Sequence, residues 1–292
     1  MPSLKSLRTR ITSVKSTRKI TKAMQLVASA KLKRAREAAE AARPYAKRIA
    51  AVVANLAANV TGDDAPALLR GTGADKVRLY VVASAERGLC GGFAANISKL
   101  ARQRIGADLA AGKTVKIITI GKKAREQMRK SYGERVIDHI DLAGAKKVGF
   151  DFAKAAANKI TDLFAAGGFD QCVLIYSEFK NVISQVPTAL QIVPATAPQG
   201  VEPTDLAGAI YRYEPTEAAI LEALLPRYMA SQIFQALLEN DAGEQGARMT
   251  AMDNATKNAG ELVNKLTLQM NRTRQAMITR ELIEIISGAD AV

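Results

Sequence analysis

Apolar side chains in the first 60 residues follow the 3-4 spacing of a coiled-coil seam. The seam starts with Leu4, Leu7, Ile11 and Val14, slips, and resumes with Ile20, Met24 and Val27. From Ser3 to about Ala58 the chain has no glycine and a single proline, Pro44, and it is rich in strong helix formers. The pattern predicts one long helix, with a kink or an interruption near Arg43 because a proline follows it.

A second seam near the C-terminus is longer and more regular. It runs in unbroken 3-4 steps through Met249, Met252, Thr256, Ala259, Val263, Leu266, Met270, Thr273 and Met277. This run predicts a coiled coil with a soft seam, because methionine and small or polar residues stand where leucine would pack more tightly. Upstream, Thr216–Asn240 is also helical in pattern, with an expected break at Pro226 and weak points at Gly243 and Gly246.

The lengths of the two helices indicate how they are used. Helices of about 55 and about 70 residues would be roughly 80 and 105 Å long, whereas a middle segment of about 140 residues would be about 35–40 Å across. Both helices join the same middle segment, so they can pair antiparallel, each covering the seam of the other. The C-terminal helix should overhang with the apolar stretch Ile278–Ile286. Such an exposed apolar tip needs a sleeve from another protein.

The middle of the chain alternates between strand patterns and helix patterns. Short β-branched runs predict strands at Val77–Ala83, Val115–Ile120 and Cys172–Tyr176. Helical patterns lie at about Ala94–Ala111, Lys122–Ser131 and Phe152–Ala166. Strands that alternate with helices predict a parallel α/β layer structure.

Three features complete the division of the chain. Val182–Val186 and Ala189–Val193 flank Pro187 and Thr188 and are interpreted as an added hairpin. Pro194–Pro203 is interpreted as a loop that returns the chain to the long helix. The expected segments are an N-terminal helix at 1–60, an α/β domain at 75–205 and a C-terminal helix at 208–292.

The positive charge of the chain is concentrated at the N-terminus. The formal net charge is +14, and residues 1–60 carry 14 Lys and Arg against two acids, Glu37 and Glu40. We expect these charges to face acidic protein surfaces. The alternatives are a solvated helix face and a helix that binds nucleic acid or an anionic membrane, although no aromatic residue interleaves the charges as nucleic-acid binding would favour. A transit peptide is disfavoured because the helical pattern continues past residue 50.

Candidate chemical sites are few. Gly88–Gly92 follows the first predicted strand, but its glycine spacing does not match a dinucleotide fingerprint, so a tight strand–helix turn is expected. Gly112-Lys-Thr114 precedes a strand instead of the helix N-terminus that a phosphate loop requires. His139, the single histidine, is expected at the surface or at a strand end, and Cys90 in a buried turn. We expect no cofactor, no metal ion and no small-molecule substrate.

Four motifs in different parts of the chain carry a resemblance to one family. Ile278-Thr-Arg-Glu-Leu-Ile-Glu-Ile-Ile-Ser-Gly-Ala-Asp-Ala291 resembles the C-terminal signature of F-type ATP synthase gamma subunits. The other three are similar to further elements of that family and follow in its order: Ile20-Thr-Lys-Ala-Met24, Arg87-Gly-Leu-Cys-Gly-Gly-Phe93 and Arg248-Met-Thr-Ala-Met-Asp-Asn254. The resemblance therefore covers essentially the whole chain.

The resemblance implies a fold and a non-catalytic role. The fold is α/β, with the terminal helices forming a long antiparallel coiled coil beside a Rossmann-like α/β domain. The implied partners are three alpha and three beta subunits, the epsilon subunit and the ring of c subunits. Rotation of the c ring turns the shaft, which drives the beta catalytic sites through their states. A peripheral position on the cytoplasmic face of a bacterial inner membrane follows, and no nucleic acid is bound.

The resemblance also assigns contact residues by motif. The residues implied to face the alpha–beta ring are Arg274, Gln275, Thr279, Glu281, Arg87, Met24, Lys22, Ile278, Leu282, Ile285 and Ile286. Those implied to face the c ring and the epsilon subunit are Tyr211, Tyr213 and Glu214. An arginine fork such as Arg274 can meet a carboxylate in a charge-assisted contact that also breaks.

This sequence departs from the family at three positions. Glu86 replaces the usual aspartate, Ala94 replaces the usual asparagine, and Pro226 interrupts a stretch of helix formers. These changes bear on local contact geometry and on helix continuity. The alternative function is a basic coiled-coil protein that binds nucleic acid, and it predicts a strong dependence of affinity on salt.

Overall fold

The computed structural model describes residues 3–60, 65–142, 144, 148–195, 214 and 216–289. The chain divides into two compact units. One unit joins Met1–Ser29 with Arg248–Val292, and the other comprises Ala30–Ala247. The units cut across the three segments expected from the sequence, because each takes part of both long helices.

Two long helices carry the ends of the chain. Helix α1 spans Leu4–Asn59 and helix α6 spans Glu217–Ala289. The expected interruptions are wrong, since α1 continues through Pro44 and α6 through Pro226. A proline inside a helix costs about 3 kcal/mol. Around Pro226 this cost is offset by packing, because Leu221, Leu225 and Tyr228 are buried in one cluster with residues of α1.

A five-stranded sheet forms the centre of the Ala30–Ala247 unit. Its strands are β1 (Val77–Ala83), β2 (Thr114–Ile120), β3 (Val136–Ile140), β4 (Gln171–Phe179) and β5 (Gln185–Val193). Their order is β3-β2-β1-β4-β5. The pairs from β3 to β4 are parallel, and β5 runs antiparallel to β4. The predicted parallel α/β layer and the three predicted strands are confirmed.

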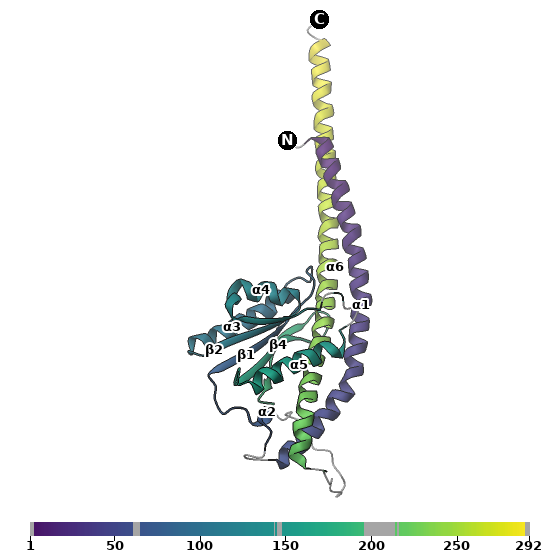
Figure 1. Ribbon diagram of the computed structural model, residues 1–292. Helices are drawn as coiled ribbons and strands as arrows, with labels where there is room; N and C mark the ends of the chain where they lie inside the picture. Colours follow the sequence, from purple (N-terminus) through teal and green to yellow (C-terminus); the bar gives the residue numbers. More distant parts are fainter. Residues whose placement is uncertain are drawn as a thin grey trace. The chain divides into compact units, whose positions relative to one another are not determined.

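Helices cover both faces of this sheet (Figure 1). The shorter helices are α2 (Ala67–Arg70), α3 (Phe93–Ala110), α4 (Lys122–Tyr132) and α5 (Phe150–Ala165), and a 3₁₀ turn at Gly133–Arg135 precedes β3. Helices α3 and α4 bury their apolar side chains in one core. Helix α5 and the stretch of α6 from Met229 to Leu237 bury theirs in a second core. The three helices predicted in this region are confirmed.

Two features of the sheet were not anticipated correctly. Strand β3 was missed because it is a short edge strand that carries polar residues, Asp138 and His139, in place of an apolar run. The hairpin expected around Pro187 is wrong, since Gln185–Val193 forms one strand and its hairpin partner is β4. Pro187 is tolerated inside β5 because this strand lies at the other edge of the sheet, where a missing N–H leaves no ladder bond broken.

No helix in the described part of the chain combines the length and the apolar character that crossing a membrane requires.

Candidate partner-contact surfaces

The terminal unit is an antiparallel pair of helices. Leu7 and Ile11 of α1 pack with Val263 and Leu266 of α6 in one buried cluster. Further along, Thr21 faces Thr256, so residue numbers rise on one helix as they fall on the other. The predicted antiparallel coiled coil is confirmed over this stretch.

The seam of α1 follows a different register from the predicted one. Its heptad positions run without a slip through Leu7, Ile11, Val14, Arg18, Thr21, Gln25 and Ala28. Thr21 and Ala28 are buried there, whereas the expected seam residues Ile20 and Val27 are 59 % and 57 % exposed. The prediction failed because it followed apolar residues, while the helix keeps its period and places polar residues in the seam.

Polar side chains in this stretch pair across the two helices. The hydroxyl oxygens of Thr21 and Thr256 are 2.8 Å apart. The side-chain amide of Gln25 donates to Asp253 Oδ1 at 2.8 Å. Hydrogen bonds from Lys257 and then from Gln25 hold the pKa of Asp253 below its usual value. A seam with polar contacts specifies register at some cost in stability.

A double-mutant cycle tests the threonine contact. Replacing Thr256 by valine should lower the free energy of unfolding by about 1 kcal/mol, because the Thr21 hydroxyl loses a partner inside the seam. Replacing both residues by valine should cost less than the sum of the two single replacements, since neither hydroxyl is then left without its partner across the helices. Urea unfolding of the four proteins measures the coupling, and strictly additive effects would show that the two hydroxyls do not interact.

An apolar strip lies on the outside of the same stretch of α1. Ile20 and Val27, which are one heptad apart on α1, are each more than half exposed, and Met24 beside them is half-buried. Lys22 is exposed and its ammonium group donates to Gln25 Oε1 at 2.9 Å. The predicted contact residue Met24 therefore lies beside an apolar strip that the seam assignment had concealed, whereas Lys22 projects from another side of α1. The signal of the strip in the sequence was the unbroken heptad count from Leu7.

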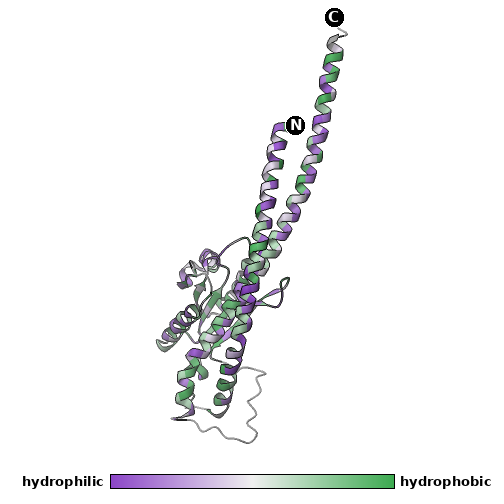
Figure 2. Ribbon diagram, turned by 90° about the vertical axis from the view of Figure 1, so that its right-hand side faces the viewer, coloured by the Kyte–Doolittle hydropathy of each residue, from purple (hydrophilic) through white to green (hydrophobic). Residues whose placement is uncertain are grey.

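The last turns of α6 carry the second exposed apolar surface. The exposed large apolar residues there are Met277, Ile278, Leu282, Ile283, Ile285 and Ile286. Ile285, for example, is 68 % exposed. Figure 2 shows hydrophobic residues recurring along this end of the helix. Met277, expected at the end of the seam, is 42 % exposed and belongs to this surface instead.

The polar residues assigned to the same region are also exposed. Arg274, Gln275, Thr279 and Glu281 all present their side chains to solvent. The hydroxyl of Thr279 donates to the backbone oxygen of Gln275 at 3.0 Å, within its own helix. The last turns of α6 therefore expose four polar residues and the apolar tip next to one another. Together they form a surface with both polar and apolar side chains.

The other assigned residues lie in the Ala30–Ala247 unit or outside the described residues. Arg87 is exposed in the turn between β1 and α3. Glu214 is exposed, and Tyr211 and Tyr213 fall outside the described residues. The expected contact with the c ring and epsilon subunit therefore stays a prediction.

The glycine-rich segment Gly88–Gly92 forms the tight strand–helix turn that was expected. Leu89 and Gly91 both adopt positive φ angles, and α3 begins directly afterwards at Phe93. Cys90 is buried in this turn, as predicted. His139 lies near the end of β3, as predicted, with its Nδ1 atom 3.0 Å from the Thr119 hydroxyl.

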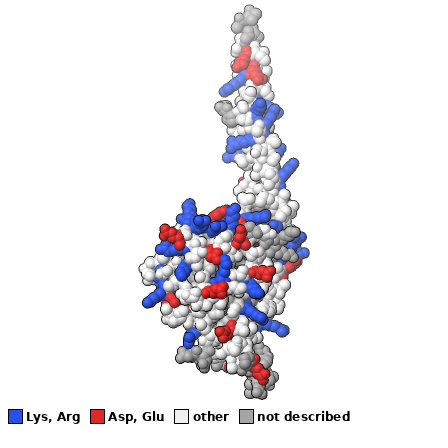
Figure 3. Space-filling view, in the orientation of Figure 1, with Lys and Arg blue, Asp and Glu red and all other residues white. Residues whose placement is uncertain are grey.

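Charge is distributed unevenly over the helices. In the space-filling view of Figure 3, Lys and Arg project along the helical pair that carries the termini, with Asp or Glu visible only near its C-terminal end in this view, whereas both signs are mixed on the α/β part. Residues 3–29 contain no Asp or Glu. A basic helix face with an apolar strip fits a partner that is both acidic and apolar.

Comparison with known proteins identifies the family. The family model described as ATP synthase matches residues 3–292. The ATP synthase gamma chain of Brucella anthropi is 59 % identical over 292 residues, and that of Sinorhizobium fredii is 59 % identical over 293 residues. In both cases the match covers 100 % of this chain and 100 % of the relative.

Solved structures agree with this result. The central stalk and c-ring structure of the Tetrahymena thermophila mitochondrial ATP synthase contains a chain that is 26 % identical, with a TM-score of 0.61 over 81 % of this chain and 99 % of that one. A chain of the Euglena gracilis mitochondrial ATP synthase, at 19 % identity and a TM-score of 0.69, covers 99 % of this chain and 94 % of its own and shows the same fold. The chain therefore belongs to the ATP synthase gamma chain family.

Proposed function

We propose that this chain is the central rotor shaft of a proton-translocating ATP synthase. In that role it couples rotation of the c ring to ATP synthesis or hydrolysis on the beta subunits, and it has no catalytic site of its own. Family membership over the full length supports this function. The structural observation that carries it is the exposed apolar tip of α6, which a protein acting alone would bury.

The partners follow from the same proposal. The alpha and beta subunits, three of each, form the ring around the helical pair, and the c ring and epsilon subunit bind at the other end. The chain is a peripheral part of this membrane complex, and we place it on the cytoplasmic face of a bacterial inner membrane. The bacterial relatives support that placement.

We assign two contact surfaces to the ring. The first is the end of α6, with Arg274, Gln275, Thr279 and Glu281 beside the apolar residues Ile278, Leu282, Ile285 and Ile286. The second combines Lys22 and Met24 with the exposed strip of α1, and Arg87 of the other unit also faces a beta subunit. We assign Tyr211, Tyr213 and Glu214 to the contact with the c ring and epsilon subunit.

The soft surface of the helical pair suits rotation. Threonine and methionine side chains offer few fixed partners, and an arginine can exchange one carboxylate for the next. A shaft that turns inside a ring needs contacts strong enough to transmit force and weak enough to be released. Exposed charge pairs contribute about 0–1 kcal/mol each, and an arginine that makes a two-pronged contact with a carboxylate contributes somewhat more, which still satisfies the second condition.

Co-expression with the alpha and beta subunits tests the proposal. We expect a purified complex that contains one copy of this chain per three alpha–beta pairs, with ATPase activity that is lost when the chain is omitted. A chain that forms no complex and instead binds DNA or RNA, with an affinity that falls steeply with salt, would support the nucleic-acid alternative. The sequence and fold matches favour the first outcome.

A further inference from the structure

The sheet has a topological switch point that α6 fills. The chain leaves β1 to build β2 and β3 on one side and then crosses to β4 on the other. Open α/β sheets bind their ligands at such a point, in the crevice outside the carboxyl ends of the strands. In this chain, Asn240 of α6 contacts β4, Glu244 contacts the turn after β1, and the backbone of α6 at Gly243 lies close to the start of α3.

Asn240 completes the hydrogen bonding of β4. The last residue of β4 that pairs with β1 is Ile175, opposite Val82. Beyond it, the backbone N–H of Ser177 donates to Asn240 Oδ1 at 3.3 Å in a buried contact. A buried N–H without a hydrogen-bond partner costs free energy. Asn240 therefore supplies the acceptor for Ser177 at the point where β1 no longer extends along β4.

Two glycines let α6 approach this edge closely. A Cβ atom on Gly243 would lie 2.8 Å from the ring of Phe93, the first residue of α3. A Cβ atom on Gly246 would lie 3.4 Å from the ring of Phe179, the last residue of β4. The glycines that the sequence marked as weak points of the helix are therefore close packing contacts with the α/β domain.

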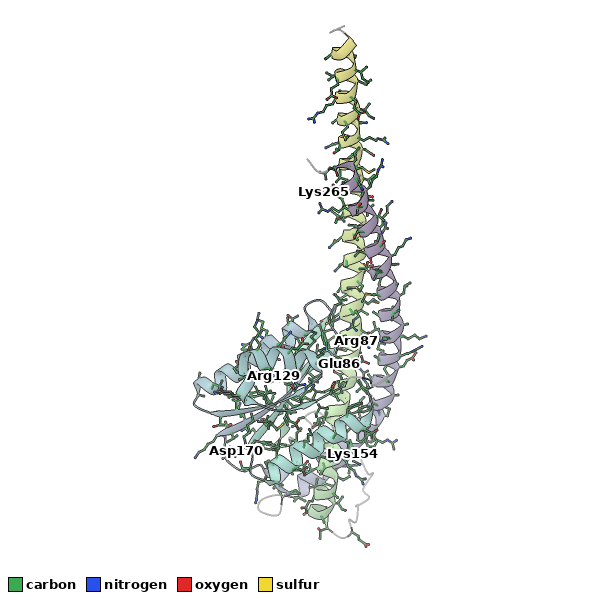
Figure 4. All side chains as sticks on the ribbon, turned by 45° about the horizontal axis from the view of Figure 1, so that its top comes forward. Glu86, Arg87, Arg129, Lys154, Asp170 and Lys265 are labelled. Carbon is green, nitrogen blue, oxygen red and sulfur yellow. The ribbon has the colours of Figure 1, made fainter. Side chains whose placement is uncertain are left out.

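The carboxylates of Glu244 and Glu86 accept backbone N–H groups at this edge of the sheet, where an anionic ligand would bind in other domains of this type. The backbone N–H of Glu86, just after β1, donates to Glu244 Oε2 at 3.1 Å. The side chain of Glu86 in turn accepts the backbone N–H of Lys122, at the start of α4, at 3.0 Å. Free N–H groups at strand-to-helix turns are where doubly wound domains hold phosphates. Figure 4 shows Glu86 and Arg87 at this edge, beside α6.

We infer that α6 is the internal ligand of the switch-point crevice, and that Glu244 and Asn240 are positioning residues that fix the α/β domain to the rotating helix. The hydrogen bonds run from α6 through the turn after β1 to the start of α4, and in parallel to β4. We call these contacts of Asn240 and Glu244 with the α/β domain the joint. This inference rests on the proposed rotor function, because the joint matters when torque passes between the helix and the domain.

The first test measures hydrogen exchange in the assembled ATP synthase. Replacing Glu244 by alanine removes the acceptor for the Glu86 N–H, so this amide should exchange about tenfold faster or more. The variant Glu244→Gln keeps an acceptor oxygen without the charge and should restore most of the protection. The matched control is Glu126→Ala, which removes an exposed carboxylate on α4. Unchanged exchange at Glu86 in Glu244→Ala would overturn the inference.

The second test measures the stiffness of the joint. A probe is attached to the variant Lys154→Cys, on an exposed position of α5, while the alpha–beta ring is held fixed. The two native cysteines of this chain are buried, so the chain is labelled at residue 154 before it is assembled with the other subunits. The angular fluctuations of the probe between steps should widen in Glu244→Ala and in Asn240→Ala, and stay at the level of the parent protein in Glu244→Gln and Glu126→Ala. If Glu244→Ala does not assemble, the fluctuations are measured in Asn240→Ala alone, which removes the hydrogen bond to β4 instead of the one to the turn after β1.

The outcomes separate the joint from the rotor function itself. A probe that does not rotate at all in the parent complex would contradict the proposed function. A probe that rotates with the same fluctuations in every variant would leave the rotor function standing and overturn the joint. Wider fluctuations in Glu244→Ala that Glu244→Gln does not reverse would also overturn the assigned role, because the acceptor oxygen would then be irrelevant.

Discussion

Replacing Gly243 by valine is expected to lower the free energy of unfolding by about 2–3 kcal/mol. Even a Cβ atom at this position would lie 2.8 Å from the ring of Phe93. Phe93 is buried, so its ring has little room to move away. Urea unfolding of the purified chain measures the loss, and the yield of assembled complex should fall with it.

Gly260 provides a matched control on the same helix. A Cβ atom there would meet only the end of the Arg18 side chain, at 3.6 Å. Gly260→Ala should therefore leave stability unchanged or raise it by up to about 1 kcal/mol, through helix propensity. The close-contact explanation would be wrong if Gly243→Val and Gly260→Ala behaved alike. It would be strengthened if Phe93→Leu partly rescued Gly243→Val in a double-mutant cycle.

Replacing Arg274 by alanine is expected to lower the rate of coupled ATP synthesis about tenfold, which corresponds to about 1.4 kcal/mol of lost interaction. Arg274 is exposed on the last part of α6, beside the apolar tip. We propose that its partner is a carboxylate on the ring of alpha and beta subunits, to which the guanidinium group donates two parallel hydrogen bonds. Arg274→Lys should recover only part of the rate, because an ammonium group cannot make the paired contact.

Arg272 is the control for this prediction. It is also exposed and carries the same charge, but two residues along a helix place it on the opposite face. Arg272→Ala should keep most of the synthesis rate in membrane vesicles energised to a fixed proton-motive force. Equal rates for Arg272→Ala and Arg274→Ala would show that net charge, and not the assigned contact, determines the effect.

The proposed contact residues have signals of different strength in the sequence. Those near the end of α6 are assigned through a specific motif, and they stay a prediction that the exposed apolar tip supports. The strip of Ile20 and Val27 was not found as such, since these two apolar residues were assumed to point into the seam. The polar contacts of Thr21 and Gln25 with α6 decide which face of α1 is inside. A single helix pattern cannot show this, because both faces carry apolar residues.

The sequence by itself determined the elements whose signal is local. The two long helices follow from period and composition, and strands β1, β2 and β4 from short β-branched runs between turn residues. Antiparallel pairing followed from length, because both helices attach to one small domain. The family followed from motifs that span the whole chain.

Only the tertiary structure decided what depends on contacts between distant segments. Helix α6 continues through Pro226 because burial of its neighbours offsets the lost hydrogen bond. Strand β3 forms because an existing sheet edge supplies its backbone partners, although its own side chains are too polar to predict it. Gly243 strengthens a joint that its helix propensity alone would weaken, since the space for its missing side chain is taken by Phe93. Helix and strand propensity depend on one segment alone, whereas packing energy depends on both of the segments that come into contact.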